Sequence, residues 1–121
     1  MSLIDQAFEM IKNEKIDCQK VNAERLDIEL PLIFLADNDY IKVSLVELDG
    51  ELFFADYGKT IGELEKEFEK IENSPIVIDR LANLEVMLDG NSLLKTTSLE
   101  TLFEDYNKFI YAIIFIQTLL Y

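Results

Sequence analysis

Residues 40–56 read YIKVSLVELDGELFFAD, and this stretch decides how the chain folds. Apolar and polar side chains alternate through residues 40–48, which is the pattern of a half-buried β-strand. Asp49-Gly50 follows, and this dipeptide is the strongest short-range signal for a two-residue hairpin turn. Residues 51–56 are the predicted return strand, so we expect an antiparallel hairpin at the centre of the chain.

The segments on the N-terminal side of this hairpin predict one helix and one further strand. Residues 2–13 carry apolar side chains at helical spacing, and Ser2 precedes them as a candidate N-cap. Residues 13–20 are polar and lead into residues 23–30, whose partial alternation predicts a half-solvated strand. Because Pro31 cannot donate a main-chain hydrogen bond, we expect this strand to end there or to lie at a sheet edge.

Two helices are predicted on the C-terminal side of the hairpin. Thr60 and Glu63 match a capping box, which indicates a helix over residues 60–71. Ser74-Pro75 then supplies an N-cap residue and a residue suited to the first helical position, so a short helix is expected over residues 75–83.

The end of the chain predicts a small hairpin and a long helix. Residues 86–88 and 92–96 are short strands on either side of a turn. Thr97 and Glu100 match another capping box, and the last helix is expected over residues 98–119.

These elements together predict a single α+β domain, residues 1–121. We expect a mostly antiparallel sheet, made of a three-strand unit and a small hairpin. It packs against N-terminal, central and C-terminal helices.

The composition narrows the classes of function. Asp and Glu number 24 and Lys and Arg 11, which gives a formal net charge of −13. Nucleic-acid binding depends on basic residues that neutralise phosphates, so we expect no direct nucleic-acid contact. The chain has no His, which excludes His-based catalytic triads and the common zinc sites. We therefore expect no cofactor, and binding rather than catalysis.

The compartment is also indicated by the sequence. Cys18 is the single cysteine, so no intrachain disulfide can form, and this fits a reducing, cytoplasmic setting. We expect it to be a buried side chain rather than a reactive thiol. The longest apolar stretch, Phe109 to Ile116, is eight residues. A membrane span needs roughly 20 residues, so we expect no membrane insertion.

One face of the predicted helix over residues 60–71 is the leading candidate for partner binding. It carries Glu63, Glu65, Glu67, Glu69 and Glu72. Such a face could recognise a basic protein surface, although an acidic helix face can also be no more than solvated.

An alternative is a metal-dependent, phosphodiesterase-like enzyme. Asp37, Asp39 and Asp56 could converge on a hard cation, with Lys42 nearby. In the competing interpretation, Asp37 and Asp39 are turn residues, and Asp56 accepts hydrogen bonds from main-chain N–H groups near Thr60. Ser44 with Lys42 is a weaker candidate for nucleophilic catalysis, and we expect both side chains to point to solvent.

A third alternative is a structural homodimer. The last helix is apolar on nearly every side beyond residue 109, so it is either a core helix or part of a subunit interface. The interface would include Phe109, Phe115 and Leu119.

Four features follow one another in a distinctive order: residues 37–41 (DNDYI), residues 55–60 (ADYGKT), a short helix with Arg80, and residues 84–93 (LEVMLDGNSL). With these motifs, residues 29–110 resemble a prokaryotic and prophage family of unknown function, domain-of-unknown-function family eighteen-twenty-eight. The family usually has Asp-Asp-Gly where this chain has Asp-Tyr-Gly at residues 56–58.

The resemblance implies a compact domain encoded by a bacterium, an archaeon or a phage, and it implies no activity. Combined with the composition, it leads us to expect a prophage or mobile-element binding or regulatory protein. Such a protein would recognise a basic protein surface without turnover.

Overall fold

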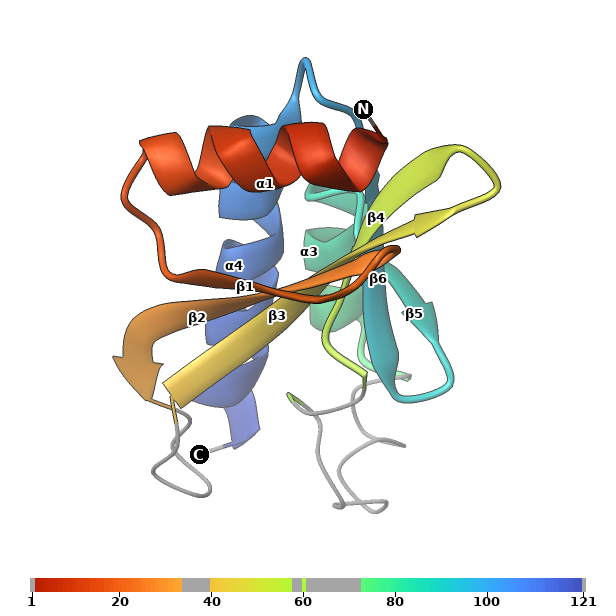
Figure 1. The fold of residues 1–121 in the computed structure, drawn as a ribbon. Helices are drawn as coiled ribbons and strands as arrows, with labels where there is room; N and C mark the ends of the chain where they lie inside the picture. The colour runs from red at the N-terminus through yellow and green to blue at the C-terminus, as the bar shows by residue number, and fades with distance from the viewer. Residues whose placement is uncertain (1, 34–39, 58–59, 61–72, 121) are drawn as a thin grey trace.

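The computed structural model describes residues 2–33, 40–57, 60 and 73–120. The strands are β1 (Cys18–Asn22), β2 (Arg25–Ile33), β3 (Tyr40–Leu48), β4 (Glu51–Ala55), β5 (Met87–Asp89) and β6 (Ser92–Thr97). The helices are α1 (Leu3–Asn13), α3 (Pro75–Asn83) and α4 (Leu102–Leu120). The strands form one antiparallel sheet in the order β1-β2-β3-β4-β6-β5, with α4 behind it in Figure 1 and α1 across its upper end. The predicted α+β class is confirmed.

The central hairpin forms as the sequence predicts. Leu48 pairs with Glu51, so Asp49 and Gly50 are the two loop residues. Both have positive φ, 53° and 78°, which is the conformation that lets a two-residue turn follow the twist of its strands.

The small hairpin is not a separate unit, because β6 pairs with β4 and extends the same sheet. Phe54 lies opposite Lys95 in this pairing. The N-terminal edge is also longer than predicted, since β1 pairs with β2 from Cys18 opposite Ile28. The strand containing Pro31 does not end there but reaches Ile33. Pro31 lies beyond the residues of β2 that pair with β1, so the hydrogen bonds between these two strands need no N–H from it.

The core lies between the sheet and the helices, because strand alternation sends every second side chain to the same face. Phe54 of β4 is fully buried at its centre, and its ring lies 5.8 Å from that of Phe109 and 6.0 Å from that of Tyr106, both on α4. Helix α1 adds Ile4 and Ile11 to the same cluster. The helix predicted over residues 60–71 lies outside the described residues, apart from Thr60.

The caps of α1 and α3 follow the prediction, and that of α4 differs. Ser2 accepts a hydrogen bond from the main-chain N–H of Asp5, and Ser74 from that of Val77. Helix α4 begins at Leu102, where residue 98 was predicted. Thr97 still belongs to β6, so Ser98 accepts the hydrogen bond from the N–H of Thr101 at 3.3 Å. None of the helices in the described residues is long and apolar enough to cross a bilayer.

Candidate functional site

The acidic helix face predicted from the sequence lies outside the described residues. Its members are Glu63, Glu65, Glu67, Glu69 and Glu72. Asp37 and Asp39, two members of the predicted cation site, also lie outside the described residues.

Asp56, the third member of that site, accepts hydrogen bonds from main-chain N–H groups. It follows β4 and is 4% exposed. One carboxylate oxygen accepts the N–H of Leu93 at 2.8 Å, and the other accepts the N–H of Thr60 at 3.1 Å. This is the strand-end role that competed with metal binding. Within residues 2–33, 40–57, 60 and 73–120, no group of three or more His, Cys, Asp or Glu could hold a metal ion.

The predicted Ser–Lys pair does not form. The hydroxyl of Ser44 donates to Asp27 at 2.7 Å, and Asp27 also accepts a hydrogen bond from the guanidinium of Arg25 at 2.9 Å. Ser44 is only 4% exposed, so the expectation that it points to solvent is wrong. Lys42 is exposed, and its ammonium lies 3.9 Å from Glu29.

Cys18 is a buried thiol on the inner side of β1. Desolvation by burial raises its pKa to about 11, which outweighs the opposing effect of Lys12. The thiolate that would be needed for nucleophilic chemistry is therefore disfavoured at neutral pH.

The three residues proposed for a homodimer interface have different environments. Phe109 is fully buried on Phe54 and belongs to the core, so it cannot contact a second subunit. Phe115 is half-buried, with the guanidinium of Arg80 4.8 Å from its ring. Leu119 is 52% exposed. The dimer stays a prediction, now without Phe109.

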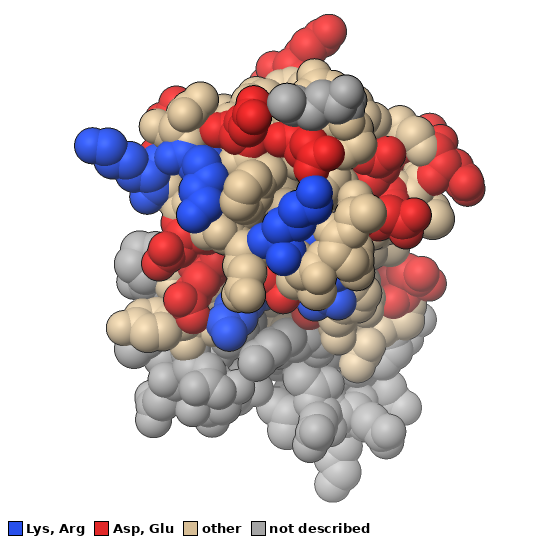
Figure 2. Space-filling model, viewed as in Figure 1, with Lys and Arg blue, Asp and Glu red and all other residues tan. Residues whose placement is uncertain are grey.

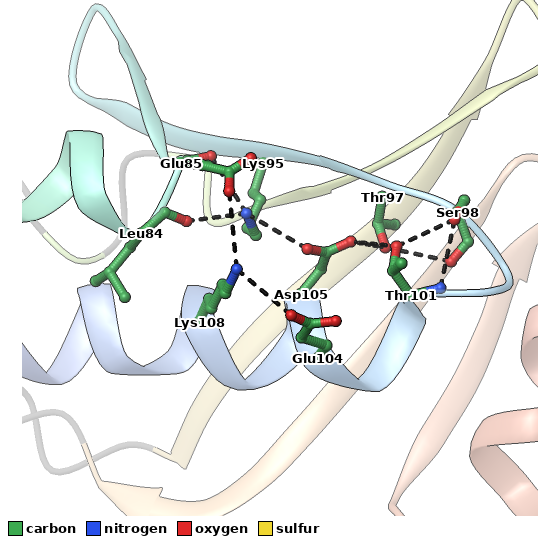
Figure 3. Close-up of polar contacts among 9 residues, drawn as sticks. All are labelled: Leu84, Glu85, Lys95, Thr97, Ser98, Thr101, Glu104, Asp105 and Lys108. Carbon is green, nitrogen blue, oxygen red and sulfur yellow. Dashed lines mark hydrogen bonds and ion pairs between the residues drawn. The ribbon is translucent and has the colours of Figure 1, made fainter.

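The structure shows a buried lysine that the sequence analysis did not select (Figure 3). Lys95 is 2% exposed on the inner face of β6. Its ammonium donates to the carbonyl oxygens of Leu84 at 2.9 Å and of Glu85 at 3.4 Å, and lies 3.5 Å from the carboxylate of Asp105. These partners match the three donors of an ammonium group, so the buried charge is paired and none of its donors faces an open site.

Asp105 is held in turn by two hydroxyl groups, as Figure 3 shows. Thr97 and Thr101 each donate to its carboxylate at 2.7 Å. Burial alone would raise the pKa of Asp105, but these hydrogen bonds and the nearby Lys95 ammonium outweigh it and lower the pKa.

This network joins three segments of the chain. Leu84 is the C-cap of α3, where a cation is favourable because the carbonyl groups of the last turn point outward. Lys95 connects that end of α3 to Asp105 in the first turn of α4. The sequence contained one signal for the burial of Lys95. It lies two residues after the apolar Leu93 in a predicted strand, and residues two apart in a strand face the same side of the sheet. The role of the network is structural.

Three exposed carboxylates lie in the β3–β4 hairpin and in the loop that follows β6. We call Asp49, Glu51 and Glu100 the acidic rim, because all three are exposed and border the β3–β4 hairpin and the β6–α4 loop. The described lysines and arginines form their ion pairs elsewhere, and none of the ion pairs found in the described segments includes a rim residue. Figure 2 shows acidic side chains on the side that carries this hairpin; the basic side chains lie in the middle and on the opposite side, where acidic ones also occur.

A groove of about 460 Å³ lies beside the rim. It is lined by residues of α1, the β3–β4 hairpin, β6 and the β6–α4 loop, among them Leu3, Glu51, Leu52, Thr96, Ser98 and Leu99.

Comparisons of the chain with family models, with curated proteins and with solved structures give no match. The resemblance to the family of unknown function stays a prediction, and the functional argument depends on the geometry of the chain itself.

Proposed function

We propose that this protein is a non-catalytic binding protein whose acidic surface recognises a basic surface on another protein. The observation that supports the proposal is the acidic rim, whose carboxylates have no cationic partner among the described residues. The cations that form ion pairs in the described segments pair with other carboxylates, as Arg25 does with Asp27 and Lys108 with Glu104.

Charge of this kind acts in two ways. The net charge of −13 attracts a basic partner from a distance and raises the rate of encounter. On contact, each exposed ion pair contributes about 0.2–1 kcal/mol, so affinity requires several pairs and falls as salt screens them. Binding is therefore expected to be strongly salt-dependent.

The proposal has a second part that comes from the sequence. The face formed by Glu63, Glu65, Glu67, Glu69 and Glu72 would add to the acidic rim as a partner-binding surface. Prophage or mobile-element origin and a cytoplasmic location are part of the same proposal, and they follow from the family resemblance and the single cysteine.

The test is affinity capture from a lysate of the cell that encodes the protein, at low and at high salt. The native chain is compared with a rim variant, Asp49→Asn with Glu51→Gln, and with a second variant that has glutamine at the five glutamates between residues 63 and 72. The matched control neutralises two exposed carboxylates near the other end of α1, Glu9→Gln with Glu14→Gln.

The proposal expects a basic protein that is retained at low salt, released at high salt and retained by the control variant. Loss of capture in the rim variant, in the glutamine variant or in both shows which acidic surface is used. A partner retained at high salt by every variant, or no partner at low salt, overturns the proposal.

A further inference from the structure

The outer face of the sheet, which points away from the core, carries apolar side chains at its centre. Leu93 and Lys95 of β6 are buried on the inner face, so Leu94 between them points outward. By the same alternation and the pairing of the strands, four neighbouring strands each place one apolar side chain there: Val46 on β3, Phe53 on β4, Leu94 on β6 and Met87 on β5. We call these four residues the outer stripe.

The outer stripe is not part of the hydrophobic core. Among the described residues, neither the core cluster nor the half-buried apolar side chains packed on it include a member of the stripe. Met87 is 57% exposed, and the other three members are partly exposed. The solvent face of an antiparallel sheet normally carries polar side chains, so apolar residues on four neighbouring strands leave a surface that a partner can cover.

The charges on the outer face are paired on one side of the stripe and unpaired on the other. Arg25 of β2 pairs with Asp27, and Lys42 of β3 lies 3.9 Å from a glutamate of β2. Glu51 of β4 and Asp89 of β5 each lie two residues from a stripe member on the same strand, so they face the same side. Neither forms an ion pair with another described residue. Figure 2 views this face and shows uncharged side chains beside the acidic ones on the side of the β3–β4 hairpin.

The spacing of the outer stripe fits a helix better than an extended segment. Neighbouring strands lie about 4.8 Å apart. Side chains on one face of a helix follow one another after three or four residues, which is about 4.5–6 Å along the axis. Side chains on one face of an extended segment are about 6.7 Å apart. The four strands therefore match about 10 residues of a helix that lies across them.

We infer that the outer stripe binds an amphipathic helix of the basic partner protein, an inference that rests on the proposed function. The apolar side of that helix packs on the stripe, and lysines or arginines beside it pair with Glu51 and Asp89. A second copy of this chain fits less well, because the same carboxylates of both copies and two net charges of −13 would meet.

The experiment is a titration of the full chain with a peptide of about 11 residues, followed by ¹H–¹⁵N NMR. The peptide has leucine at helical spacing on one side and lysine at the other positions. One control peptide has the same composition in an order without an apolar side, and a second has glutamate in place of lysine. We expect saturable shifts at the amides of Phe53, Leu94 and Met87, and an affinity lower by about five-fold or more for either control peptide.

Variants of the chain test the two parts of the surface. Met87→Gln should weaken binding of the lysine peptide about five-fold, because it removes an apolar contact at an exposed position. Phe53→Thr, with its fold checked by circular dichroism, should have a larger effect. Glu51→Gln with Asp89→Asn should weaken binding about five-fold and reduce its salt dependence. The matched control is Ile76→Gln, because Ile76 is 68% exposed on α3, and it should leave binding unchanged.

Three results overturn the inference: equal binding of either control peptide, shifts only at other residues, or an unchanged affinity in Met87→Gln. Light scattering that shows a dimer of the native chain, dissociated by Met87→Gln, also overturns it, because a second copy then occupies the stripe.

The capture experiment separates the inference from the proposed function. If Met87→Gln captures the basic partner as the native chain does, while the rim variant loses it, the inference is wrong and the proposed function stands. If the lysine peptide binds the stripe but no basic partner is captured at low salt, the proposed function is wrong and the outer stripe is still the surface that binds a basic helix.

Discussion

Replacement of Lys95 by methionine is expected to lower the free energy of unfolding by about 3 kcal/mol. Methionine keeps most of the apolar stem of lysine but removes the ammonium group. The carbonyl of Leu84 then loses a hydrogen bond of 2.9 Å, that of Glu85 loses one of 3.4 Å, and Asp105 loses its cation at 3.5 Å.

The magnitude follows from what remains after the substitution. Removing one partner of a buried ion pair costs roughly 3–5 kcal/mol, because the other partner is left without compensation. Asp105 retains the hydroxyl groups of Thr97 and Thr101 and is 14% exposed, which places the cost at the lower end of that range. For a chain of this length the change corresponds to a fall in Tm of about 10 °C.

The assay is urea unfolding followed by circular dichroism for Lys95→Met, Asp105→Asn and the double variant. The three variants form a double-mutant cycle, and we expect a coupling energy of about 1–2 kcal/mol between the two side chains. Lys42→Met is the matched control, because the side chain of Lys42 is 60% exposed and lies 3.9 Å from Glu29. Its effect should stay within about 0.5 kcal/mol. If Lys95→Met unfolds at the same urea concentration as the control, the structural role of the network is refuted.

The same network predicts a dependence on pH. The pKa of Asp105 is lowered in the folded protein, so the folded state binds this proton less readily than the unfolded chain does. Its stabilisation is complete above the ordinary value of 3.8 and is lost as the pH falls through the lower pKa of the folded state. The stability difference between the native chain and Asp105→Asn should therefore shrink between neutral pH and pH values below 3.8.

Three further predictions concern single residues. Asp56→Asn should cost about 2 kcal/mol in urea unfolding, since an amide replaces a buried carboxylate that accepts two main-chain N–H groups, and an unchanged midpoint would contradict the role described. Gly50→Ala should cost about 1 kcal/mol from its positive φ alone, because a Cβ there meets no atom within 4 Å; a stabilised variant in thermal melting would argue against the turn geometry. Cys18 should react with a thiol reagent at neutral pH only on unfolding, owing to its burial and raised pKa, so rapid labelling without denaturant would disprove it.

Local signals in the sequence identified most of the secondary structure. The turn at Asp49-Gly50 and the caps at Ser2 and Ser74 each depend on residues within a few positions of one another, and the structure confirms them. The errors were local too. Helix α4 begins at Leu102 because Thr97 remains paired in β6. The polar segment at residues 13–20 was expected only to lead into a strand, but its end belongs to β1. Four of the five side chains of β1 are exposed, so this strand lacks the alternation of apolar and polar residues that predicts a strand.

The candidate site depended far more on contacts between distant segments. The sequence favoured Asp56 as a main-chain acceptor over a cation ligand, but it did not identify Leu93, 37 residues away, as a partner. Lys95 resembles an ordinary strand lysine until Leu84 and Asp105 surround it.

The sequence alone determined the α+β class, the central hairpin and the excess of negative charge, because alternation, turn preference and composition are properties of neighbouring residues or of their sum. Only the tertiary structure decided that the small hairpin joins β4 through β6, that one lysine is buried, and that a groove opens beside the acidic rim. Those features depend on which strand pairs with which and on how α1 and the β6–α4 loop meet the hairpin. These contacts are set by the packing of segments that are distant in the sequence, and no short sequence pattern predicts that packing.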